Sequence, residues 1–160
     1  MKIISIDPGY ERLGIAIIDK EKNQESLVFS CCFKTSSKLS HPERLGLIKN
    51  ELDNIIKTYK PEHLAIERLF FSKNEKTALL VSEARGLIIG NCQSHEIKVF
   101  EYGPGEIKVA VTGYGRSDKN SIIKMIPKLI KMSPEKLTSI KHDDEFDAIA
   151  VGLTHSATIR

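Results

Sequence analysis

The chain has 160 residues, a length at which one domain buries most of its apolar surface, so we expect a single domain spanning residues 1–160. Its hydrophobic fraction of 41% and charged fraction of 28% exclude a disordered, collagen-like or coiled-coil chain. No apolar run approaches the ~18 residues needed to cross a bilayer, and the first run is too short for a signal peptide. We therefore expect a cytoplasmic protein with no membrane partner.

Cysteine usage agrees with a reducing compartment. The sequence has three cysteines, of which Cys31 and Cys32 are adjacent, and it has no CxxC spacing. This pattern indicates neither a disulfide framework nor a zinc site.

The net charge of +3 is unevenly distributed. Residues 104–141 hold eight Lys or Arg against three acids, whereas the following nineteen residues hold four acids and one Arg. A basic segment followed by acids suits a metal-dependent enzyme that acts on a polyanion. Charge alone nevertheless favours the simpler interpretation, a solvated helix face followed by an acid-rich helix start.

The first third of the sequence predicts strands. Residues 2–7, 13–19 and 26–33 are rich in strand-forming residues, with a turn at Asp7-Pro8-Gly9 and a polar loop before the third run. These features predict a three-stranded antiparallel meander.

Two helices and a strand follow. Ser40 and Glu43 have the spacing of a capping box, and apolar residues then recur at helical spacing until Lys60-Pro61. Residues 63–67 form a short apolar run typical of a strand. Ser72 and Glu75 predict the start of a second helix, which we expect to continue to about Gln93.

Small residues form a stripe on that second helix. Ser82, Gly86 and Gly90 are four residues apart, and each glycine costs ~1 kcal/mol of helix propensity relative to alanine. Something must approach closely to offset this cost. The stripe predicts either a dimer interface or close packing against the sheet, and both interpretations remain open.

The last third alternates short helices with one more strand, at residues 97–101. A loop covers residues 112–117, and a terminal helix is expected over about 142–158. Pro127 should kink or divide the helix that begins near Asp118. The whole pattern predicts an α/β fold with a five-stranded mixed sheet flanked by helices.

Four carboxylates are candidates for metal binding. Asp7 and Glu67 stand at the ends of the first and fourth strands, and ligands of open α/β sheets bind beyond such strand ends. Asp144 and Asp147 are three residues apart and share a helix face. Four clustered carboxylates would repel one another without a metal ion or a proton. Their convergence therefore predicts a site for divalent metal ions, of the kind that a two-metal phosphodiester hydrolase needs.

Several motifs carry a family resemblance. They are Ile6-Asp7-Pro8-Gly9 with Gly14, Ala65-Ile66-Glu67-Arg68-Leu69-Phe70 with Lys73-Asn74, Glu83-Ala84-Arg85-Gly86, Val99-Phe100-Glu101-Tyr102, residues 108–115 with Lys119, and Asp147-Ala148-Ile149-Ala150 with Thr154-His155. In this order they resemble the RuvC family of Holliday-junction resolvases, over nearly the whole chain. The resemblance implies a ribonuclease H-like fold, a homodimer, Mg²⁺ or Mn²⁺ as cofactor, and paired nicks in two strands of like polarity of a four-way DNA junction. Such an enzyme serves homologous recombination and DNA repair, and the branch-migration complex is a further possible partner.

The resemblance also implies site residues. By position, the metal-binding and catalytic acids are Asp7, Glu67, Asp144 and Asp147. The expected DNA-binding residues are Phe70, Lys73, Lys108, Arg116 and Lys119, with Phe70 placed among the bases near the junction and the lysines at the phosphates.

Three positions depart from the family pattern. Some relatives carry His where Asp144 stands, so its assignment rests on the offset from Asp147, and Asp143 or His142 could share the role. Ser121 replaces a frequent Gln, and Pro127 interrupts a helix that is usually continuous. The other histidines lack a ligand spacing and are expected to be structural.

Two other functions remain as alternatives. One is a catalytically inactive junction-binding protein, although the full carboxylate set argues against it. The other is a different ribonuclease H-like enzyme, either a nuclease of RNA–DNA hybrids or an actin-like ATPase. The ATPase needs more length than this chain has, and the hybrid nuclease would not be expected to keep Phe70 and the motif Gly113-Tyr114-Gly115.

Overall fold

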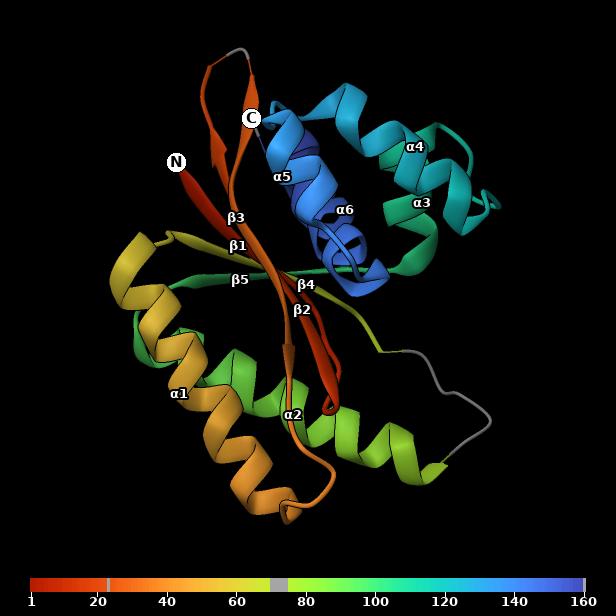
Figure 1. Cartoon of the computed structure of the whole chain (residues 1–160). Coiled ribbons are helices and arrows are strands. Elements are labelled where there is room, and N and C mark those ends of the chain that lie inside the picture. Colours follow the sequence, from red (N-terminus) through yellow and green to blue (C-terminus); the bar gives the residue numbers. More distant parts are fainter. Residues whose placement is uncertain (23, 70–74, 160) are drawn as a thin grey trace.

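The computed structural model describes residues 1–22, 24–69 and 75–159. One mixed sheet separates two helical layers (Figure 1). The five strands lie in the order β3-β2-β1-β4-β5. Their bounds are β1 Lys2–Asp7, β2 Arg12–Lys20, β3 Glu25–Lys34, β4 His63–Glu67 and β5 Lys98–Tyr102.

The helices of the described chain divide between the two faces of the sheet. Their bounds are α1 His41–Tyr59, α2 Glu75–Ser94, α3 Pro104–Thr112, α4 Lys119–Leu129, α5 Pro134–Ser139 and α6 Asp143–Thr158. α1 and α2 cover one face, and α6 lies on the other face with α3, α4 and α5 around it (Figure 1). No helix in these described ranges is long and apolar enough to cross a membrane.

The strand directions confirm the predicted mixed sheet. β1 pairs antiparallel with β2 and parallel with β4. β2 pairs antiparallel with β3, and β4 pairs parallel with β5. Both parallel pairs are joined through helices, as parallel strands require.

Each face of the sheet has its own apolar cluster. Ile4 and Ile6 of β1 face α1 and α2, whereas Ile3 faces α6, because successive side chains of a strand point to opposite faces. All three side chains are completely buried. The central strand is therefore covered on both sides, as its continuous apolar run indicates.

The ends of α1 are confirmed. The backbone N–H of Ser40 donates to the Glu43 carboxylate at 2.8 Å, which is half of a capping box. The helix ends at Lys60, whose φ of 51° is left-handed, and Pro61 follows. A proline there cannot continue the helix.

The small residues of α2 do not pack against the sheet. Gly86 and Gly90 are exposed, and a Cβ atom built on either would meet no heavy atom of the described residues within 4 Å. The buried side of α2 instead carries Ala84, Ile88 and Cys92. The interpretation that the small residues admit the sheet is therefore wrong. The proposed helix start at Ser72 lies outside the described residues.

Pro127 does not divide its helix. α4 runs through Pro127 to Leu129. The proline lies in the last turn, where it removes only one backbone hydrogen bond and few residues follow. Ile122 and Ile126 are buried and hold the helix on its neighbours.

α6 crosses the sheet at very short range. Its residues from Glu145 to Ser156 are buried except for Asp147. At Gly152, an added Cβ would lie 2.6 Å from both Ile18 Cδ1 and Ser5 Oγ. Only a residue without a side chain allows this separation between helix and sheet.

We expect Gly152→Ala to destabilise the protein by ~1–3 kcal/mol, because overpacking forces strands β1 and β2 away from α6. The matched control is Gly46→Ala in α1, where an added Cβ meets nothing within 4 Å and should stabilise the helix by up to ~1 kcal/mol. Thermal unfolding checks both. Equal melting temperatures for the two variants would contradict the close approach at Gly152.

Candidate active site

One row of residues crosses the sheet at the end where β1 and β4 terminate. Asp7 is paired with Gly14, Gly14 with Cys32, and Glu67 with Tyr102. Ile6 of β1 is aligned with Ile66 of β4. Asp7 and Glu67, one residue farther along each strand, are therefore adjacent across the sheet. Directly paired residues project from the same face, and this is the face that α6 covers.

Gly14 makes room in that row for the start of α6. A Cβ on Gly14 would lie 2.0 Å from the backbone oxygen of Asp144. The first turn of α6 therefore rests on the backbone of β2. This contact brings Asp144 and Asp147 to the same end of the sheet as Asp7 and Glu67.

The four predicted acids lie close enough to change one another's ionisation. The pKa of Asp7 is raised from 3.8 to about 7, first by burial and then by the charges of Asp147, Glu67 and Asp144. Burial, then the charge of Asp147, raises the pKa of Glu67. Burial also raises the pKa of Asp147. The predicted convergence of these carboxylates is therefore present in the fold.

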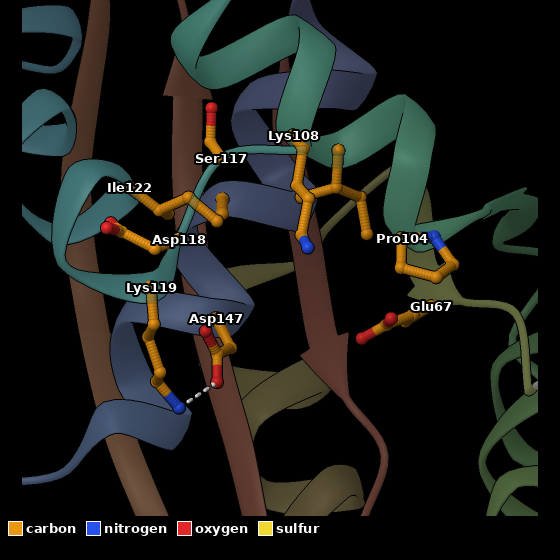
Figure 2. A pocket seen from close by; sticks show the side chains of 10 residues that line it. Glu67, Pro104, Lys108, Ser117, Asp118, Lys119, Ile122 and Asp147 are labelled. Atoms are coloured by element: carbon orange, nitrogen blue, oxygen red, sulfur yellow. Dashed lines mark hydrogen bonds and ion pairs between the residues drawn. The ribbon is translucent and has the colours of Figure 1, made fainter. Parts of the chain in front are cut away.

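Two lysines line a cavity together with two of the four acids. Glu67 and Asp147 line a pocket of about 260 Å³ together with Lys108 and Lys119 (Figure 2). Lys119 Nζ lies 2.8 Å from Asp147 Oδ2 and 3.5 Å from Asp143 Oδ2. Its charge lowers the pKa of Asp7, and the charge of Lys108 lowers that of Glu67, both against the larger effect of burial. The pocket thus contains anions that attract metal and cations that attract phosphate.

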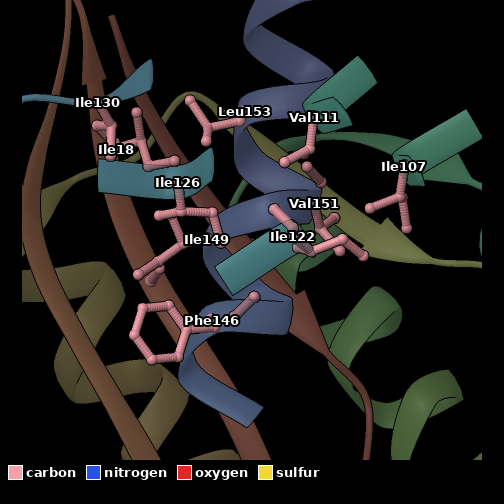
Figure 3. Close-up of a cluster of buried hydrophobic side chains, with 14 of the residues drawn as sticks. Ile18, Ile107, Val111, Ile122, Ile126, Ile130, Phe146, Ile149, Val151 and Leu153 are labelled. Atoms are coloured by element: carbon pink, nitrogen blue, oxygen red, sulfur yellow. The ribbon is translucent and has the colours of Figure 1, made fainter. Parts of the chain in front are cut away.

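Apolar packing fixes the helices that carry these lysines. Ile107 of α3 and Ile122 of α4 are buried in the cluster around Val151 of α6 (Figure 3). Each of these isoleucines is next to or near a pocket lysine, Lys108 or Lys119 respectively. The two ammonium groups are therefore held by the same core that holds Asp147.

The structure distinguishes Asp144 from Asp143. Asp144 is half-buried and its charge raises the pKa of Asp7, whereas Asp143 is exposed and is not among the groups that shift it. Asp143 instead raises the pKa of Asp147, after the larger effect of burial, and the assignment of Asp144 as a metal ligand stays a prediction.

The remaining predicted site residues are Arg116, Phe70 and Lys73. Arg116 is exposed, and within the described part of the chain it makes no hydrogen bond or ion pair. Phe70 and Lys73 lie outside the described residues. Their proposed contacts with DNA stay predictions.

Sequence reasoning missed a buried hydrogen-bonded chain beside this site. His155 Nδ1 lies 2.7 Å from the Tyr102 hydroxyl, and its Nε2 lies 2.9 Å from His63 Nδ1. Burial lowers the pKa of His155 to about 4, so its ring is neutral at pH 7. The chain ties α6 to β4 and β5. The paired residues are 53 and 92 positions apart in the sequence, so no local sequence pattern could have revealed these hydrogen bonds.

The raised pKa of Asp7 has a consequence for stability. The folded metal-free protein keeps this proton up to about pH 7, whereas the unfolded chain releases it near pH 3.8. The stabilisation from this group is therefore complete below pH 3.8 and is lost as the pH rises through about 7.

We expect Asp7→Asn to raise the melting temperature of the metal-free protein at pH 8, because an amide carries no charge to repel its neighbours. Each ~1 kcal/mol gained should add ~2–4 °C. The same variant at pH 5 is the control, since Asp7 is then already neutral in the folded protein and the difference should shrink. Identical differences at both pH values would contradict the raised pKa.

Comparisons with known proteins agree with this geometry. The family model described as crossover junction endodeoxyribonuclease RuvC matches residues 3–155. The RuvC of Alkaliphilus oremlandii is 42% identical over 158 residues, covering 99% of this chain and 94% of the relative. The RuvC of Fusobacterium nucleatum is 41% identical over 155 residues, covering 97% and 80%.

Solved structures give the same result. Thermus thermophilus RuvC in complex with a Holliday junction substrate has a TM-score of 0.89 at 26% identity, covering 98% of this chain and 93% of that one. The fowlpox virus Holliday junction resolvase, at 17% identity and a TM-score of 0.67, shares the fold. The expected ribonuclease H-like fold is confirmed. From residue 3 to residue 155, the chain belongs to the RuvC family of crossover junction endodeoxyribonucleases.

Proposed function

We propose that the protein is an endonuclease that resolves four-way DNA junctions by paired, metal-dependent nicks in two strands of like polarity, in homologous recombination and DNA repair. The observation that carries this proposal is the clustering of four carboxylates from β1, β4 and α6, two of which, Glu67 and Asp147, line a pocket with two lysines. Family membership supports the junction as substrate, because the Thermus relative is solved with a Holliday junction bound.

The donor set fits Mg²⁺, with Mn²⁺ as a substitute. Asp7, Glu67, Asp144 and Asp147 offer only carboxylate oxygens, the ligands that hard divalent cations prefer. Bound ions would supply an activated water and stabilise the leaving 3′ oxygen, leaving a 5′ phosphate. The pKa of Asp7, raised to about 7, means that this group would release a proton on binding metal at neutral pH.

The lysines would hold the DNA backbone. Lys108 and Lys119 face the pocket, where their ammonium groups can contact the phosphate beside the metal ligands, and Arg116 would add a contact from its exposed loop. We further propose that Phe70 stacks on a base at the crossover and that Lys73 contacts the backbone beside it.

A homodimer would match the two equivalent strands of the junction with one active site per subunit. The exposed stripe of Ser82, Gly86 and Gly90 on α2 supports an interface there, because neither glycine is approached by the described chain. The branch-migration complex is a further proposed partner.

Two alternatives predict different substrates or no reaction. An inactive junction-binding protein would bind a four-way junction but leave it uncut, and a hybrid nuclease would cut RNA paired with DNA. The protein should be incubated with a synthetic four-way junction, a linear duplex and an RNA–DNA hybrid, each with Mg²⁺ and with chelator. Nicking of the junction alone, and only with Mg²⁺, is the expected result.

We expect Asp7→Asn, Glu67→Gln, Asp144→Asn and Asp147→Asn each to abolish nicking, because each removes a metal ligand. Binding to the junction should survive, since phosphate contacts supply most of the affinity. Gel-shift and nicking assays on the same preparations check both. The matched control is Asp143→Asn. If that substitution is the damaging one and Asp144→Asn is not, the assignment on α6 is wrong by one residue.

We expect Gly90→Leu to convert the dimer to a monomer, because a large side chain would separate two helices that meet at the stripe. Light scattering measures the mass, and circular dichroism shows whether the variant is folded. Gly46→Leu, also exposed with free space around its Cβ position, is the control and should stay dimeric. A folded dimer of Gly90→Leu would remove α2 from the interface.

A further inference from the structure

A thiol, an imidazole and a carboxylate meet beside the nuclease pocket. One ligand atom from each of Cys32, His142 and Asp144 lies within 4.8 Å of the other two. Cys32 Sγ is 3.7 Å from Asp144 Oδ2. All three side chains are half-buried.

The fold brings these residues together from two distant segments. Cys32 stands at the outer end of the row that crosses the sheet through Gly14 to Asp7. His142 is the N-cap of α6, and Asp144 lies in its first turn. The contact of Gly14 with the Asp144 backbone therefore places Asp144 and the N-cap residue His142 near Cys32.

The distances are near those of a bound ion. Zn²⁺ binds sulfur at about 2.3 Å and nitrogen or oxygen at about 2.0–2.2 Å, so tetrahedral ligand atoms are about 3.3–3.6 Å apart. The Cys32–Asp144 distance of 3.7 Å already approaches that range. The imidazole nitrogen lies within 4.8 Å of the other two atoms and would have to move closer to both on binding an ion.

The imidazole is available for this purpose. Within the described ranges, the His142 ring makes no hydrogen bond or ion pair. A metal ion would compete for the Asp144 carboxylate with the Arg12 guanidinium, which lies 4.0 Å from Asp144 Oδ2 and is largely exposed. An exposed arginine can leave at low cost.

We propose that Cys32, His142 and Asp144 form a site for a thiophilic divalent ion of the zinc type, with water as its fourth ligand. Thiolate and imidazole select zinc over magnesium, which prefers the all-oxygen set next to it. The ion would take Asp144 from the magnesium ligands and so inhibit nicking. This inhibitory consequence rests on the proposed function, whereas binding itself does not.

Cobalt tests the binding without any nuclease assay. Co²⁺ added to the whole protein, with a non-thiol reductant present, should give a thiolate-to-metal charge-transfer absorption in the near ultraviolet, and Zn²⁺ should abolish it by displacement. Cys32→Ser should lose this band. Cys31→Ser is the matched control, because the neighbouring cysteine packs on the opposite face of the sheet, and it should keep the band.

Nicking of the junction under Mg²⁺ measures the consequence. Loss of a residue that only hydrogen-bonds to a metal ligand weakens metal binding about tenfold or more. Loss of a ligand itself should cost at least as much. The Zn²⁺ concentration that halves the nicking rate should therefore be at least about tenfold higher for Cys32→Ser and for His142→Gln than for the wild type, each rate being compared with that variant's rate without Zn²⁺. Cys31→Ser should respond as the wild type does.

Two results would overturn the proposal. One is the absence of the cobalt band from the wild type, and the other is its persistence in Cys32→Ser. Equal zinc inhibition of wild type and Cys32→Ser would overturn the inhibitory role. A protein that shows the band but nicks no junction would refute the proposed function and leave the metal site established.

Discussion

The contact between Gly14 and the start of α6 determines where the acids of the site can be. With no side chain at position 14, the backbone oxygen of Asp144 rests on β2, at a point where a Cβ would be 2.0 Å away. Farther along the helix, Gly152 makes a second close contact of this kind, with Ser5 and Ile18 of the sheet. The helix is thereby held against the sheet at two points, and the carboxylates of α6 meet those of β1 and β4. Any larger side chain at position 14 would separate the two halves of the site.

Burial and like charge make this arrangement unfavourable without a counterion. The pKa of Asp7, about 7, reflects the free-energy cost of ionising a buried carboxyl group beside three other carboxylates. The apolar cluster beneath α6 and the Tyr102–His155–His63 chain stabilise the helix where the charges would otherwise push it away. The packing of α6 thus stabilises an arrangement that repulsion between the carboxylates destabilises, as is common at functional sites.

Much of this could be predicted from local sequence. The strands predicted around Ile4, Ile15 and Phe29 match the observed strands to within one residue at each end. Alternation of apolar residues and turn residues are local signals, which is why these strands could be predicted. The acids at 7, 67, 144 and 147 followed from strand ends and helix periodicity with the family resemblance. Pairing across the sheet could not be predicted in this way. The neighbourhood of Cys32 and His142 depends on the register of β2 with β3, which shifts between Ile17 and Ile18, and no short-range pattern encodes it.

Lys119 connects two binding events through thermodynamic linkage. In this structure the ammonium group of Lys119 forms ion pairs with Asp147 and Asp143. A cation that takes the oxygens of Asp147 must displace this ammonium, which then becomes available to a phosphate at the same pocket. Arrival of either ligand would thus lower the free-energy cost of the other, and by reciprocity the affinity for DNA and the affinity for metal would rise together.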